Sequence, residues 1–90
     1  MPTKPVMAVF DSAVGAFMSP FVVPAVGAAM RGFADEVNKS GPDAGPVSQH
    51  PEDFELHELA LFDEENGRFL QAENHPRLVS RGKDAVRRSE

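Results

Sequence analysis

The sequence contains no cysteine, tryptophan or tyrosine, and no run of 18 or more apolar residues. Without cysteine neither a disulfide nor a thiolate metal site can form, so a structural metal would need histidine and carboxylate ligands. Without a long apolar run no membrane span is predicted, and the N-terminus lacks the charged and apolar segments of a signal peptide. We therefore expect a protein of the cytoplasm of the cell that makes it.

A 9.8 kDa chain has little core to stabilise it. A domain of this size removes only about 60% of its unfolded surface from water, and no disulfide is present to compensate. A short sheet also leaves strand edges that can pair with another chain. We therefore expect self-association, as a symmetric homodimer.

Charge is distributed unevenly along the chain, whose net charge is -5. Residues 35–75 contain eleven acidic residues against two basic ones, whereas residues 76–90 contain five basic residues against two acidic ones. This predicts a single acidic domain at residues 1–76 and a flexible basic tail at residues 77–90. Because affinity for phosphate comes mainly from Lys and Arg, any contact with nucleic acid or an acidic partner is expected in the tail. The candidate contact residues are Arg77, Arg81, Lys83, Arg87 and Arg88.

Hydrophobic periodicity changes along the first half of the chain. The short apolar run Val6–Phe10 is typical of a buried strand. Residues 16–23 are interrupted by Pro20 and closed by Pro24, which predicts an irregular extended arm with its aromatic side chains turned inward. From residue 25 to 38 apolar residues recur with helical spacing, which predicts an amphipathic helix. Its apolar stripe consists of Val26, Ala29, Met30, Phe33 and Val37.

The run from Phe54 to Phe62 fits either a helix or a strand. Good helix formers favour the first, and a strand puts Leu59 and Leu61 on the same face as Phe54 and Leu56 only if a bulge near His57-Glu58 adds a residue. The turn sequence Asn66-Gly67, followed by a second strand-like run at residues 68–72, favours a hairpin. The expected fold class is therefore α+β, with one amphipathic helix packed on a small, mainly antiparallel sheet that has a C-terminal β-hairpin. Pro76 is expected to end the ordered domain.

No residue pattern predicts catalysis, a cofactor or a metal. The spacing of His50, His57 and His75 matches no zinc site, which favours one capping and two solvated histidines. The acidic clusters at residues 52–53 and 63–65 are typical of solvated turns. The seven phenylalanines are expected to form the core. We therefore expect a protein that is not an enzyme.

Several motifs together resemble a known family. They are Val9-Phe10-Asp11-Ser12-Ala13, Ser19-Pro20-Phe21, the segment from Ala29 to Asn38, the segment from Val47 to Leu56, which contains His50-Pro51-Glu52-Asp53-Phe54, and Phe62-Asp63-Glu64-Glu65-Asn66-Gly67. In this order they resemble the small nonstructural protein of gokushovirus-type microviruses, which are single-stranded DNA bacteriophages. The resemblance covers roughly residues 6–70. It implies a protein of the host bacterial cytoplasm that acts in viral DNA replication or in the switch towards single-strand synthesis and packaging, and it supplies no catalytic residue.

Three functions remain open from the sequence. The first is a non-catalytic adaptor or regulator that binds a phage replication or packaging protein. The second is a virion-associated or assembly protein that contacts the capsid or packaged DNA through its basic tail, with only weak binding to single-stranded DNA. The third is an acidic protein that blocks a host nucleic-acid-binding protein by mimicking phosphate charge.

Overall fold

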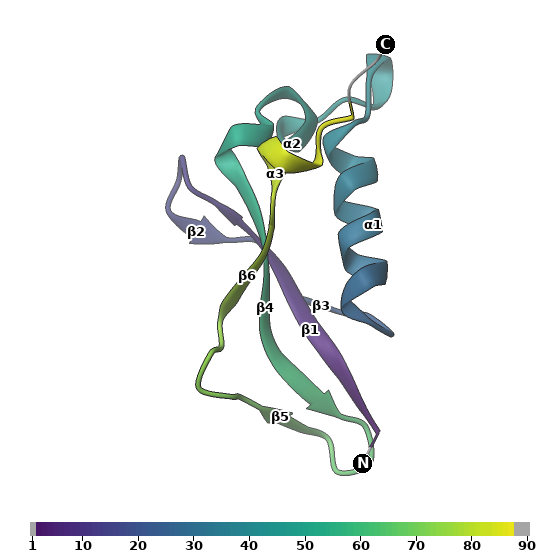
Figure 1. Ribbon diagram of the computed structural model, residues 1–90, viewed down its shortest axis with the longest axis vertical. Coiled ribbons are helices and arrows are strands. Elements are labelled where there is room, and N and C mark those ends of the chain that lie inside the picture. Colours follow the sequence, from purple (N-terminus) through teal and green to yellow (C-terminus); the bar gives the residue numbers. More distant parts are fainter. Residues whose placement is uncertain (1, 88–90) are drawn as a thin grey trace.

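The computed structural model describes residues 2–87, which form one long helix against a six-stranded antiparallel sheet (Figure 1). The strands are β1 (Thr3–Asp11), β2 (Ala16–Phe17), β3 (Phe21–Val22), β4 (Phe54–Asp63), β5 (Arg68–Leu70) and β6 (Arg77–Arg81). The helices are α1 (Val26–Val37), α2 (Pro46–Gln49) and α3 (Gly82–Ala85), with short 3-10 turns at η1 (Gly41–Asp43) and η2 (Pro51–Asp53). The predicted α+β class is confirmed.

The sheet is built around the long antiparallel pair β1 and β4. On its other edge β1 pairs with β3 and β2, while the other edge of β4 pairs with β5 and β6. Figure 1 shows β1 and β4 crossing at the centre, with α1 standing along one side. Every edge strand is short, from two to five residues. Short edges limit pairing with other chains.

The strand interpretation of residues 54–63 is confirmed, and so is the hairpin that follows it. Asp63 pairs with Arg68 across the turn, and Gly67 adopts a φ of 68°, which only glycine adopts without strain. The register against β1 shifts between Val6 and Met7, which leaves Leu59 as the extra residue of a bulge. The bulge therefore lies slightly beyond its predicted place.

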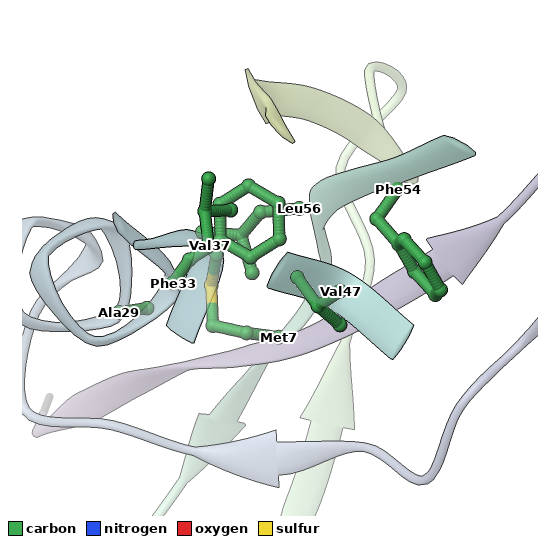
Figure 2. Packing of buried hydrophobic residues seen from close by; sticks show 7 residues of the cluster. All are labelled: Met7, Ala29, Phe33, Val37, Val47, Phe54 and Leu56. Carbon is green, nitrogen blue, oxygen red and sulfur yellow. The ribbon is translucent and has the colours of Figure 1, made fainter. Parts of the chain in front are cut away.

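The core lies between α1 and one face of the sheet (Figure 2). Helix α1 contributes Ala29, Phe33 and Val37, as its periodicity predicts, but Met30 is 42% exposed. The remaining buried residues of the cluster come from β1, α2 and β4, and they are Met7, Val47, Phe54 and Leu56. Figure 2 shows Phe33 and Val37 pointing toward Leu56 and Met7.

The prediction of a flexible tail from residue 77 is wrong for the part of it that the structure describes. Residues 77–81 form β6, which pairs with β4, and residues 82–85 form α3. The reason is that β5 pairs with only the last three residues of β4, so the backbone groups of residues 55–58 need another strand. The single domain therefore continues past Pro76, and residues 88–90 lie outside the described range.

Two contacts hold this C-terminal segment. Gly82 is buried so closely against η2 that a Cβ atom there would collide with the carbonyl oxygen of Pro51 and lie 3.0 Å from that of Phe54. The side chain of Asn38, at the end of α1, donates to the carbonyl of Ala85 (3.0 Å) and accepts from the backbone N–H of Arg87 (2.7 Å). The segment is thus attached to both the sheet and the helix.

The arm at residues 16–23 is extended, as expected, but its aromatic side chains are not buried. Phe17 and Phe21 are 43% and 41% exposed. Strands β2 and β3 pair only with the edge of β1, so no second layer covers their side chains. Of the seven phenylalanines, which were expected to form the core, only Phe33 and Phe54 are buried.

Candidate interaction surfaces

The cations predicted as nucleic-acid contacts lie next to acidic side chains of the body. Arg77 Nε is 2.9 Å from Glu58 Oε1, Arg81 Nε is 3.8 Å from Glu55 Oε2, and Arg87 Nη2 is 2.8 Å from Asp35 Oδ1. Lys83 is exposed and makes no ion pair with the residues that the structure describes, and Arg88 lies outside them. Ion pairing therefore offsets much of the positive charge expected of a tail.

Glu58 is the centre of a buried polar cluster. It is 6% exposed, and its Oε1 accepts hydrogen bonds from His75 Nε2 (2.8 Å) and Arg77 Nε (2.9 Å). Burial by itself raises the pKa of this carboxyl group, but the hydrogen bonds and charges of His75 and Arg77 together outweigh burial and lower the pKa below its ordinary value. Glu58 is therefore held as a carboxylate inside the sheet.

The hydrogen bonds of His75 determine its tautomer. Its Nδ1 accepts from the backbone N–H of Ala72 (2.9 Å), so in the neutral ring the proton is on Nε2 and is donated to Glu58. The side chain is only 3% exposed, and that of His57 is 16% exposed, so the prediction of two solvated histidines is wrong. Glu58 lies 17 residues from His75 and 19 from Arg77, so no local motif marks the cluster. Its role in the structure is to join β4 to the segment that enters β6.

The acidic groups at residues 63–65 are not all solvated either. Asp63 is 2% exposed, and its Oδ1 accepts from the backbone N–H groups of Glu65 (3.0 Å) and Asn66 (3.2 Å). Its Oδ2 accepts from the side-chain amide of Asn66 (3.0 Å), which is the main reason that the pKa of Asp63 is lowered. This carboxylate therefore stabilises the turn between β4 and β5.

Among the described residues, one group of side chains has its potential ligand atoms close enough together to hold a metal ion. The ligand atoms of His50, Glu52 and Asp53 lie within 4.8 Å of one another at η2. His50 and Glu52 are exposed, and exposed acidic groups of this kind are common without a metal. The cluster therefore does not argue for a metal site.

An apolar groove separates α1 from the arm. It has a volume of about 370 Å³, and its floor includes Val9, Ala29 and Phe33. The exposed side chains of Met18 and Phe21 form one wall, and the small residues Ala28 and Gly32 of α1 form the other; Val23, Glu36 and Val47 complete the lining. Residues 12–30 contain no charged residue. The groove and its walls thus form a mainly apolar surface open to solvent, with Glu36 as the one charged residue of the lining.

An aromatic cluster lies on the other face of β1, because Phe10 follows Val9 and successive strand side chains point to opposite faces. The ring of Phe17 lies 4.8 Å from that of Phe10 and packs edge-on against His57 at 5.3 Å. His57 Nδ1 is buried and has no hydrogen-bond partner among the described residues. A second pair, Phe62 and Phe69, lies on β4 and β5 with ring centroids 5.4 Å apart. These rings stabilise the sheet through aromatic contacts between neighbouring strands.

Comparison with protein families gives a match over most of the chain. The model of the family described as phage ORF5 protein matches residues 4–85, a range that takes in nearly every strand and helix, including β6 and α3. The chain belongs to the phage ORF5 protein family. It is therefore a bacteriophage protein.

No curated protein and no solved structure matches this phage ORF5 protein. Among the residues that the structure describes, no helix has both the length and the apolar character needed to cross a membrane.

Proposed function

We propose that this phage ORF5 protein is a non-catalytic adaptor or regulator of genome replication and packaging in a gokushovirus-type microvirus, acting in the host cytoplasm. The proposal rests on one structural observation: Arg77, Arg81 and Arg87 lie in ion pairs with acidic residues. These pairs leave an acidic body without a strong basic surface, and such a body disfavours direct binding to the phosphate backbone.

The surface is better suited to protein partners. Nine large apolar side chains among the described residues are at least 40% exposed, and four of them, Met30, Phe69, Leu78 and Val86, lie outside the segment from residue 14 to residue 22. Exposed acidic side chains that make no ion pair with a Lys or Arg of residues 2–87, such as Glu52, Glu65 and Glu73, are available for a partner with a basic surface. Proteins that replicate, package or enclose DNA have such basic surfaces, so charge complementarity would guide their encounter.

An infection experiment tests the role in replication. A phage with an early stop codon in this reading frame is compared with a phage carrying a synonymous change at the same codon. We expect the stop mutant to accumulate less single-stranded genome, measured by strand-specific quantitative PCR, while the amount of major capsid protein stays normal. Normal genome synthesis with defective particles would contradict the proposal.

A second function, association with the virion through packaged DNA or the capsid, is favoured by one observation. The ion pair of Arg87 with Asp35 is exposed on both sides, at 62% and 58%, so a phosphate group can compete for this arginine. Lys83 is exposed nearby in the chain. Mass spectrometry of purified virions against the lysate of infected cells separates the two functions, since only the second requires the protein in the particle.

Salt dependence tests the DNA contact. If all five cations released counterions from single-stranded DNA, the log–log slope would be about -3.5, since each contributes about -0.7. Because Arg77 and Arg81 are paired with acidic residues, we expect a slope of about -2 or shallower. The variants Lys83→Gln and Arg87→Gln should weaken binding further, whereas a slope near -3.5 would contradict the ion-pair argument.

A further inference from the structure

The chain exposes more surface than a monomer of its mass usually does. Its accessible surface is 5907 Å², whereas a folded monomer of 9.8 kDa exposes about 5,200 Å². The excess reflects an elongated molecule, 45 × 25 × 21 Å in extent. An interface of standard size buries roughly 800 Å² on each partner, so the chain has ample surface for one.

The mainly apolar surface around the groove suits such an interface. Met18 and Phe21 line the groove from the arm and are 51% and 41% exposed, and α1 lines it with Ala28 and Gly32, which have little or no side chain. The one charged residue of the lining, Glu36, is paired with Lys39 at 2.8 Å. A partner would therefore meet an apolar surface that requires no burial of an unpaired charge.

We propose that a second copy of this chain covers this surface. In a two-fold dimer the same patch meets itself, so it must carry both a projection and a hollow that accepts it. This patch carries both: Met18 of each protomer would enter the groove beside Gly32 of the other. Methionine suits this role because its flexible side chain adapts to an irregular groove.

The proposed interface differs from the pairing of sheet edges that the sequence suggests. The edge strands β2, β3, β5 and β6 are too short to present a long ladder of free backbone groups. The inference does not depend on the proposed function, because it rests only on surface area, shape and charge.

Sedimentation equilibrium of the full chain at 1–100 µM tests the proposal. We expect the wild type to sediment with twice the 9.8 kDa mass of the chain. Met18→Asp and Gly32→Glu should each raise the dimer Kd by about thirtyfold or more, the effect expected at the centre of an interface. Both variants should fold, since Met18 is 51% exposed and a Cβ at Gly32 meets nothing within 4 Å.

The matched control is Phe69→Asp, which places the same charge at a 67% exposed apolar residue on β5. In the sheet, β4 separates β5 from β1, the strand that lines the groove. This variant loses the ring contact with Phe62 and some stability with it, but it should remain a folded dimer, and circular dichroism should show all three variants folded. A wild type that is monomeric at 100 µM would overturn the proposal. So would a dimer that survives Met18→Asp and Gly32→Glu but dissociates with Phe69→Asp.

Discussion

Substitution of Gly82 by alanine tests whether the C-terminal segment belongs to the fold. Gly82 begins α3 and lies against η2, where an added Cβ would collide with the Pro51 carbonyl oxygen. Backbone atoms cannot move aside as a flexible side chain would, so the contact between α3 and η2 must open. Overpacking of this kind typically costs about 1–3 kcal/mol, occasionally more.

The expected loss is large for so small a domain. Proteins of 90 residues have a free energy of unfolding of roughly 5–13 kcal/mol. Each 1 kcal/mol lowers the Tm of such a domain by about 4–8 °C, so Gly82→Ala should lower it by about 4–24 °C. Thermal unfolding followed by circular dichroism measures this shift, and urea unfolding gives the free energy directly.

Gly27→Ala is the matched control for this measurement. Gly27 lies in α1, and a Cβ there meets nothing within 4 Å, so the same substitution should raise stability by up to about 1 kcal/mol through helix propensity. The two variants should therefore shift the Tm in opposite directions. An unchanged Tm for Gly82→Ala would refute the packing of α3 against η2 and restore the flexible tail.

Three further outcomes are expected. Phe33→Ala should cost about 3–5 kcal/mol because Phe33 is only 5% exposed at the centre of the core, and an unchanged urea midpoint would mean that α1 does not cover the sheet. Deletion of residues 77–90 should unfold much of the domain, since it leaves β4 without β6; an unaltered far-UV spectrum would contradict this. Because the folded pKa of Glu58 lies below its ordinary value of 4.5, the stabilisation from this carboxylate is complete above that value and is lost as pH falls through the folded pKa. Glu58→Gln should therefore be less stable at pH 7 and lose less stability than wild type between pH 5 and 3, and parallel curves for the two proteins would contradict the reasoning.

The sequence by itself determined the elements whose signals are local. The spacing of Ala29, Phe33 and Val37 predicted α1 to within a residue at each end. The Asn66-Gly67 turn between two apolar runs predicted the β4–β5 hairpin. Residues a few positions apart create these signals, so no knowledge of the rest of the fold is needed to interpret them.

Only the tertiary structure decided the fate of the C-terminal segment and of the arm. Strand β6 exists because β5 leaves residues 55–58 of β4 unpaired, and the cluster of Glu58, His75 and Arg77 forms because that pairing brings distant residues together. The apolar pattern of Phe17 and Phe21 predicted burial, yet burial depends on a second layer that β2 and β3 do not have. Periodicity shows which side chains favour an apolar environment, but the arrangement of the other elements determines whether the chain supplies one.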